Sequence, residues 1–401
     1  MNGTLRASLG LLVAGALAGA CRDGTGNVTE VPTDDVPAFD AGTFDAGFFD
    51  AGTPVDTGSA RDARADVPRD TGPSCVCPTL PATCTAPSPD VPAFSPGPTL
   101  LNQVAAVVAC ATTSLHLALY ETTWDCLPSL LAARLRAVPG LTVQIVIDAD
   151  DCPAGDGGAA CPIRALEGTA GVQIVADNRT ALMHHKFIVA DGTSVWVGSA
   201  NSSQQSYCQD ANDAVVVSEA GIVAAYEAEF QRMFHDHAFG PTAATAPVTA
   251  GHYAAYFSPR MPSGSPARWF TDLVAAINGA TTSVDFVIAS WTRTEISDAL
   301  IAARMRGVSV QGVVAPEYAN DLPAQALLRA GVPIRTGQVH SKMMVVDGST
   351  VMTGSANWSA AAWDNNENSL WIRDAAIGAA YEAYFTRQFG VATVPPLVRD
   401  R

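Results

Sequence analysis

Positive charge is the scarcest feature of this sequence. Of its 401 residues only 23 are lysine or arginine, against 39 aspartates and glutamates, and the formal net charge is −16. A chain this acidic repels long polyanions, and it has no basic stripe along which a nucleic-acid backbone could lie. The balance of charge therefore argues against a nuclease, although a small positive pocket can still exist locally.

Lysine is almost absent. The chain holds two, Lys186 and Lys342, and uses arginine at every other basic position. A lysine ammonium is compact and rotatable, whereas the arginine guanidinium is a planar fork, so the two are not interchangeable at a site that needs a point charge. Both lysines fall in the same repeated pattern, which makes an accident of composition a poor explanation.

The repeated pattern is H-x-K-x4-D-G-x5-G-S-x-N, and it occupies residues 184–201 and 340–357. In each copy four apolar residues follow the lysine, as in a buried strand, and they place the histidine and the lysine on the same side. The Asp-Gly pair predicts a turn, and a second short strand then returns Gly-Ser-x-Asn beside the histidine. Each copy is thus a predicted hairpin that gathers an imidazole, an ammonium, a hydroxyl and an amide, a set suited to a phosphodiester.

The similarity between the two copies extends beyond the motifs. Phe-Ser-Pro, Ala-Thr-Thr-Ser and a helical Ala-Ala-Arg segment recur in the same order before each motif, and an Ala-Ala-Tyr-Glu helix follows each one. Alternating strands and helices of this kind predict an α/β sheet with helices on its faces. We therefore expect two fused, duplicated α/β/α halves, residues 89–245 and 246–395, related by a pseudo-two-fold axis.

This arrangement resembles the phospholipase D superfamily, whose signature is a paired HxKxxxxD motif followed by GSxN. The resemblance implies one active site at the interface of the two halves and a two-step displacement through a phosphohistidine. It implies His184 as the nucleophile and His340 as the acid/base. It needs no cofactor and no metal, because two ammonium groups supply the positive charge. The other implied site residues are the phosphate-binding Lys186, Lys342, Asn201 and Asn357, the supporting Ser199 and Ser355, and the motif aspartates Asp191 and Asp347, which begin turns and are scaffold as much as chemistry.

A catalytic imidazole needs an acceptor for its far nitrogen. The resemblance places Glu367 where it would orient His340. In the first copy the matching position is Asn212, flanked by Asp210 and Asp213; either aspartate could orient His184 after a small shift in register, and we favour Asp213. Histidine 185 points to the other face and is expected to be packed or solvated. Three tryptophans are read either as the rim of a head-group pocket or as ordinary packing: Trp291, Trp358 and Trp363.

The N-terminus carries an export signal. Residues 1–20 combine a short basic start, an apolar run too short to cross a bilayer, and small residues. Two processing alternatives stay open: cleavage at an Ala-x-Ala site, or a lipid anchor at Cys21, which we favour because residues 21–88 begin with a polar stalk. Residues 22–72 hold eleven acidic and four basic side chains and cannot build a core. We expect an exported protein, lipid-anchored in a bacterial cell envelope or secreted.

Eight further cysteines, all before the middle of the chain, fit disulfides in an exported protein. Cys152 and Cys161 flank a glycine-rich loop that they could close. A zinc site formed by Cys75, Cys77 and Cys84 is the alternative, although no histidine lies near them.

Together these features predict an exported monomeric phosphodiesterase of the phospholipase D type, which hydrolyses or exchanges phospholipid head groups at a membrane surface. The alternatives are an endonuclease of the same superfamily, which the charge disfavours, and a surface-attached binding or virulence-type factor with a vestigial site.

Overall fold

The computed structural model describes residues 75–81, 83–155, 160–242, 246–259 and 264–398. The predicted signal peptide, Cys21 and the acidic stalk lie outside the described residues. Within the described part, no helix is both long and apolar enough to span a bilayer.

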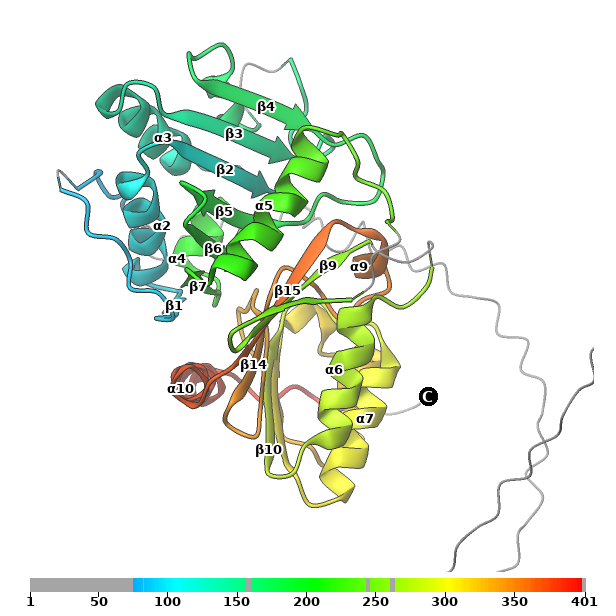
Figure 1. The fold of residues 1–401 in the computed structure, drawn as a ribbon. Helices are drawn as coiled ribbons and strands as arrows, with labels where there is room; N and C mark the ends of the chain where they lie inside the picture. Colours follow the sequence, from blue (N-terminus) through cyan, green and yellow to red (C-terminus); the bar gives the residue numbers. More distant parts are fainter. Residues whose placement is uncertain (1–74, 82, 156–159, 243–245, 260–263, 399–401) are drawn as a thin grey trace, which may run out of the picture. The chain divides into compact units, whose positions relative to one another are not determined.

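The first half of the described chain forms a seven-stranded mixed sheet in the order β1-β7-β6-β5-β2-β3-β4 (Figure 1). Strands β2, β3 and β4 run parallel, and the remaining neighbours pair antiparallel. Its members are β1 (Ala93–Phe94), β2 (Ser114–Leu119), β3 (Thr142–Ile147), β4 (Val172–Ala176), β5 (Lys186–Ala190), β6 (Ser194–Gly198) and β7 (Asp213–Val217).

The second half forms an eight-stranded sheet in the order β12-β11-β10-β13-β14-β15-β9-β8, in which β10, β11 and β12 are parallel. As the duplication predicts, each sheet contains three parallel strands next to the antiparallel hairpin of its motif. The strands are β8 (Val248–Ala250), β9 (Tyr253–Ser258), β10 (Ser283–Ile288), β11 (Ser309–Val314), β12 (Ile334–Thr336), β13 (Lys342–Val346), β14 (Thr350–Gly354) and β15 (Glu367–Arg373).

Helices cover both faces of each sheet, which explains why the central strands are apolar on both sides. Two long helices, α5 and α10, share one apolar core with strands of both sheets, while α2 and α3 cover the outer face of the first sheet and α6 and α7 that of the second. The predicted α/β class with two duplicated halves is confirmed. The helices are α2 (Pro98–Cys110), α3 (Cys126–Ala137), α4 (Gln204–Cys208), α5 (Ala220–Phe234), α6 (Arg268–Gly279), α7 (Thr294–Met305), α8 (Leu322–Arg329), α9 (Ala361–Asp364) and α10 (Ala375–Val391), with 3₁₀ turns at Pro162–Leu166 and Pro316–Tyr318.

Two short backbone bridges join the halves next to the motif histidines. In one, Asn366 donates its N–H to the carbonyl of Leu182 and accepts from the N–H of His184 (2.8 and 3.0 Å). In the other, Ala211 donates to Gln338 and accepts from the N–H of His340 (both 2.9 Å). The bridges are equivalent under the pseudo-symmetry, so each motif begins on a strand segment anchored to the opposite half.

All eight cysteines of the described chain are paired: three disulfides join residues 75–84 to the first half, and the fourth lies within that half. The Cys152–Cys161 bond closes the glycine-rich loop as predicted. The zinc alternative is wrong, because Cys75, Cys77 and Cys84 each bond a different cysteine. Four disulfides indicate an oxidising, extracytoplasmic environment. The pairs are Cys75–Cys208, Cys77–Cys126, Cys84–Cys110 and Cys152–Cys161.

Candidate active site

The two motifs fold as the predicted hairpins, β5–β6 and β13–β14. At each turn the motif aspartate takes a left-handed conformation, with φ of 52° at Asp191 and 50° at Asp347. The Asp191 carboxylate accepts the backbone N–H groups of residues 112–114, and Asp347 accepts those of residues 281–283. These hydrogen bonds hold the pKa of Asp191 at about 2. Both aspartates lie at the opposite strand end from the histidines, so they clamp the fold and do not contact the reacting groups.

The acceptor for His184 is Glu367, not Asp213. The Nδ1 of His184 lies 2.8 Å from Oε2 of Glu367, and both side chains are fully buried. The expected pairing of Glu367 with His340 is therefore wrong. The error has a simple cause: the bridge through Asn366 brings the start of β15 alongside the first motif, so the glutamate orients the histidine of the opposite half.

The same crossing occurs at the second histidine. The Nδ1 of His340 lies 3.0 Å from Oδ1 of Asn212, which follows the Ala211 bridge. Asp213, expected to orient His184, instead points into the core, where Thr353 and Tyr381 donate to its carboxylate. Burial raises the pKa of Asp213, as expected of a structural carboxyl group. One histidine is thus backed by a carboxylate and the other by an amide.

The histidines and lysines share one electrostatic environment. Burial lowers the pKa of His184 far below its usual value, and the charges of Lys186, Lys342 and His340 lower it further, although the Glu367 carboxylate acts in the opposite sense. The ammonium of Lys186 donates to the carbonyl of His184 (2.9 Å), and that of Lys342 lies 3.1 Å from Nε2 of His340. The neutral form of His340 with its proton on Nδ1 fits both contacts, because Nδ1 donates to Asn212 and Nε2 accepts from Lys342. The form that can act as an acid carries a second proton on Nε2.

The motif serines have structural partners. Ser199 donates to Oδ1 of Asn212 (2.9 Å) and accepts from the N–H of Asp213 (3.0 Å), and Ser355 accepts from the N–H of Asn368 (2.9 Å). Both are fully buried. They tie each hairpin to the next strand.

Two residues beside the site were not predicted. The Tyr120 ring packs edge-on against His184 (4.7 Å between centroids), and the ammonium of Lys186 lies 5.0 Å from the centre of the same ring. Glu121 accepts a hydrogen bond from Nδ2 of Asn201 (2.6 Å). Both residues come just after the end of β2, the strand that pairs with β5 of the first motif. That position in the sequence could have indicated that they lie beside the site.

The remaining sequence alternatives resolve as packing. His185 is fully buried, with Nε2 3.3 Å from Glu229. Trp291 and Trp358 are buried and meet edge to face at 5.3 Å, and Trp363 belongs to the same core. The tryptophans therefore do not rim a head-group pocket.

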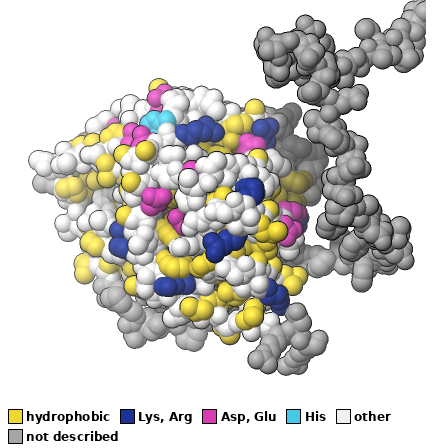
Figure 2. All heavy atoms as spheres, turned by 90° about the horizontal axis from the view of Figure 1, so that it is seen from below, with side chains coloured by type: hydrophobic (Ala, Val, Ile, Leu, Met, Phe, Trp, Pro, Cys, Tyr) yellow, Lys and Arg dark blue, Asp and Glu magenta, His cyan; other side chains and the backbone are white. Residues whose placement is uncertain are grey.

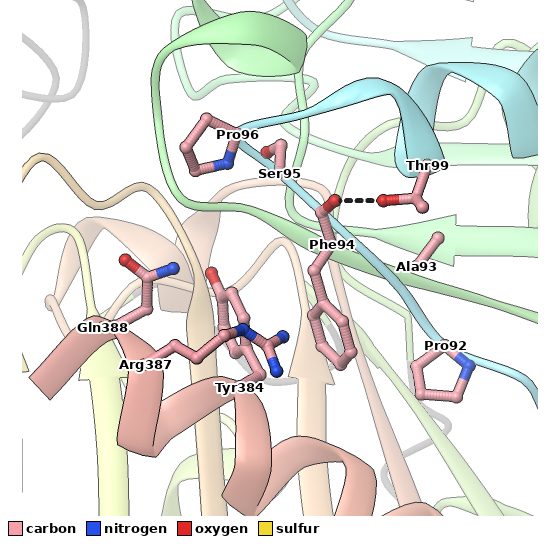
Figure 3. A pocket seen from close by; sticks show the side chains of 9 residues that line it. All are labelled: Pro92, Ala93, Phe94, Ser95, Pro96, Thr99, Tyr384, Arg387 and Gln388. Atoms are coloured by element: carbon pink, nitrogen blue, oxygen red, sulfur yellow. Dashed lines mark hydrogen bonds between the residues drawn. The ribbon is translucent and has the colours of Figure 1, made fainter. Parts of the chain in front are cut away.

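A pocket of about 250 Å³ lies where the start of α2 meets α10 (Figure 3). Phe94 stacks on Tyr384 there, with centroids 4.3 Å apart, and the guanidinium of Arg387 lies 5.8 Å from the Phe94 ring centre. None of the motif residues lines it. It is a junction between the halves, separate from the histidine pair.

Comparison with known proteins gives the class. The family described as the PLD-like domain of cardiolipin synthase matches residues 106–234 and 273–389, one segment in each half, and the chain belongs to this family of phospholipase D-like phosphodiesterases. Among curated proteins, it is similar to the mitochondrial cardiolipin hydrolases of Xenopus laevis (33% identity over 125 residues, 29% of this chain and 60% of the relative) and Homo sapiens (28% over 120 residues, 28% and 47%). The chain thus spans between about half and three fifths of the length of these relatives.

Solved structures support the two-half fold. The phosphatidylserine synthase of Haemophilus influenzae aligns with a TM-score of 0.57 and 12% identity, covering 74% of this chain and 86% of its own. The polyphosphate kinase of Porphyromonas gingivalis aligns with a TM-score of 0.54 and 14% identity, covering 78% and 52%. At these identities the likeness concerns the fold alone.

Proposed function

We propose that this protein cleaves, or exchanges, the head group of phospholipids through a phosphohistidine formed on His184, with His340 as the acid/base. The observation that carries the proposal is the pair of imidazoles, one from each half, each held through Nδ1 by an acceptor of the opposite half and accompanied by a lysine. With Nδ1 engaged, Nε2 is the nitrogen that each ring can offer to phosphorus or to an ester oxygen.

The asymmetry between the two imidazoles supports the order of roles. A nucleophilic histidine becomes cationic once it bonds to phosphorus, and the Glu367 carboxylate stabilises that charge on His184. The lowered pKa keeps His184 neutral, as a nucleophile must be. His184 is 1% exposed whereas His340 is only partly buried, which suits a group that must reach a leaving alcohol and then a water molecule.

The four remaining polar groups of the motifs supply the charge that a phosphoryl group requires. Lys186 and Lys342 place two ammonium groups beside the histidines, and Asn201 and Asn357 end the two hairpins at the same edge. In our proposal these side chains bind the non-bridging oxygens and stabilise the negative charge that builds up during displacement.

The substrate class rests on the relatives and on charge. The curated relatives are named for hydrolysis of cardiolipin, a phospholipid. A nuclease would need a basic path for the polyanion, yet on the face shown in Figure 2 the arginine side chains form separate spots among neutral, apolar and acidic ones. In our proposal the protein is exported and anchored at Cys21, and it meets its substrate at a membrane surface.

The test is to trap the intermediate with a substrate whose leaving group needs no acid. With a p-nitrophenyl phosphodiester, His340→Asn should release one equivalent of nitrophenol and accumulate a phosphoenzyme on His184, whereas His184→Asn should release none. Parallel turnover of phospholipid vesicles and of DNA by the wild type then decides the substrate class. Cleavage of DNA alone would contradict the phospholipid assignment, and absence of any burst in both variants would contradict the enzyme itself.

A further inference from the structure

The two halves differ sharply in charge at equivalent positions around the site. In the first half, the residues that follow β2, β3 and β4 are Glu121, Asp148 and Asp177. In the second half the residues at these positions are uncharged. Paired backbone hydrogen bonds fix the correspondence between these positions.

The carbonyl of Glu121 accepts the N–H of Ser202, just after the motif asparagine, and the carbonyl of Ser290 accepts that of Trp358 in the same way. The N–H of Asp177 donates to the carbonyl of Ile147, the last residue of β3. In the same way the N–H of Gly337 donates to the carbonyl of Val314, the last residue of β11. Asp148 and Ala315 are the residues directly after those same strands. Three carboxylates on one flank thus correspond to Ser290, Ala315 and Gly337 on the other.

The acidic flank is adjacent to the phosphate-binding groups. Asp148 accepts the N–H of Met183, the residue before His184, at 2.8 Å. The turn after it carries Asp151, whose carboxyl group interacts electrostatically with Lys186 as well as with Glu121 and Asp148. Burial, and then these two neighbouring carboxylates, raise the pKa of Asp151 to about 7, while Lys186 acts in the opposite sense, and a cation bound beside Asp151 would favour its charged form.

Several polar atoms on this flank lack protein partners. Asn201 is 95% buried (5% exposed) and held against Glu121 through Nδ2, yet its Oδ1 accepts no hydrogen bond within the described chain. The same holds for Oδ2 of Asp177, which is 6% exposed, and for Oδ2 of Asp151. Buried acceptors of this kind are normally satisfied, so they point to a donor that the substrate brings. No three carboxyl, imidazole or thiol groups of the described residues are arranged to hold a metal ion.

We propose that the flank formed by Glu121, Asp148, Asp151 and Asp177 binds a cationic alcohol arm of the phosphodiester, an ammonium group such as that of an ethanolamine or choline ester. This inference deepens the proposed function and rests on it. The ammonium of an ethanolamine ester donates to the open acceptors, whereas the trimethylammonium of a choline ester has no N–H and is attracted by the carboxylates through its charge alone. In both cases Lys186 holds the phosphoryl group next to the cation. The neutral flank of the second half lacks this charge and faces the other ester arm.

The experiment compares vesicles that differ only in head group: phosphatidylethanolamine and phosphatidylcholine against phosphatidylglycerol, with matched acyl chains. The full-length wild type should favour the two cationic lipids in kcat/KM. Asp151→Asn should lower kcat/KM for them, through KM, by about tenfold more than it changes kcat/KM for phosphatidylglycerol. Asp150→Asn, an exposed carboxylate on the same turn, is the matched control and should behave as wild type.

The outcomes separate the possible failures. An equal loss of kcat on all three lipids would show that Asp151 only positions Lys186, and would overturn the inference. Equal use of the three lipids by the wild type would overturn it as well, while leaving the proposed function intact. If no phospholipid is turned over although a p-nitrophenyl diester is cleaved, the phospholipid assignment itself fails.

Discussion

Replacing the carboxylate behind His184 should slow the chemistry without unfolding the protein. Glu367→Gln keeps the size of the side chain and an oxygen that can accept from Nδ1, but removes the negative charge. With Nδ1 and Oε2 2.8 Å apart, the charge centres of an imidazolium and this carboxylate lie about 4 Å apart, and their attraction is about 4 kcal/mol at an effective dielectric constant of about 20. Because the amide dipole retains part of this, we expect a loss of about 2–4 kcal/mol, or about 30- to 1000-fold in kcat.

The measurement is single-turnover and steady-state hydrolysis of a p-nitrophenyl phosphodiester, with thermal unfolding as the check on structure. Glu367 is fully buried, so the neutral glutamine should leave the melting temperature near that of the wild type. A folded Glu367→Gln enzyme with kcat within about threefold of wild type would refute the reasoning, because 2 kcal/mol corresponds to about 30-fold.

The chain provides its own comparison at Asn212, where an amide already backs the second histidine. In Glu367→Gln both histidines have amide acceptors. Adding Asn212→Asp to that variant moves the carboxylate to His340, and the pseudo-symmetry then predicts that the phosphoryl group is found on His340 by peptide mapping. If it stays on His184 in the folded double variant, features other than the carboxylate decide which imidazole attacks.

Three further predictions concern the scaffold. Asp191→Asn and Asp347→Asn should each cost about 1–2 kcal/mol of stability in urea denaturation and leave kcat unchanged. Because the folded-state pKa of Asp191 is about 2, below the usual value of 3.8, the stabilisation by its carboxylate is present above about pH 4 and is lost as the pH falls towards 2. Acid unfolding of the wild type compared with Asp191→Asn tests this pH dependence. Gly354→Ala should destabilise by about 3 kcal/mol and disturb the motif, since φ is 131° and the added Cβ would lie 2.5 Å from the carbonyl oxygen of Asn368; a normal melting temperature would contradict it. Reduction of the disulfides should lower the free energy of unfolding, with Cys75–Cys208, which spans 133 residues, contributing about 2–5 kcal/mol by comparison with a double serine variant.

Local rules predicted the hairpins correctly. The apolar run after each lysine, the Asp-Gly pair and the returning Gly-Ser-x-Asn segment appear as β5–β6 and β13–β14 because period-two alternation and turn chemistry act over a few residues. The disulfide across the short loop at Cys152 was predictable for the same reason. Parallel repeats outside the motifs predicted the two sheets.

The orienting groups could not be predicted in this way. Glu367 lies 27 residues after His340 and Asn212 lies 28 residues after His184, so sequence spacing assigns each to the nearer motif. The actual partners are exchanged because the backbone bridges of Asn366 and Ala211 cross between the halves, a three-dimensional contact that spacing does not encode. Likewise the hydrogen bond between Ser199 and the adjacent strand follows from the register of β6 and β7, which sequence spacing does not encode.

Exchange of the orienting groups also explains how a duplicated chain can perform an asymmetric reaction. Two equivalent imidazoles would compete for the same role, yet displacement at phosphorus needs one neutral nucleophile and one proton donor. The scaffold remains symmetric where it only positions groups, as at the aspartate clamps and the bridges. It departs from symmetry where charge matters: a carboxylate faces His184 where an amide faces His340, and Glu121 stands where the other half has Ser290. Since both departures add negative charge beside the first histidine, they act in the same sense, favouring a cation on His184 and a cationic arm of the substrate next to it.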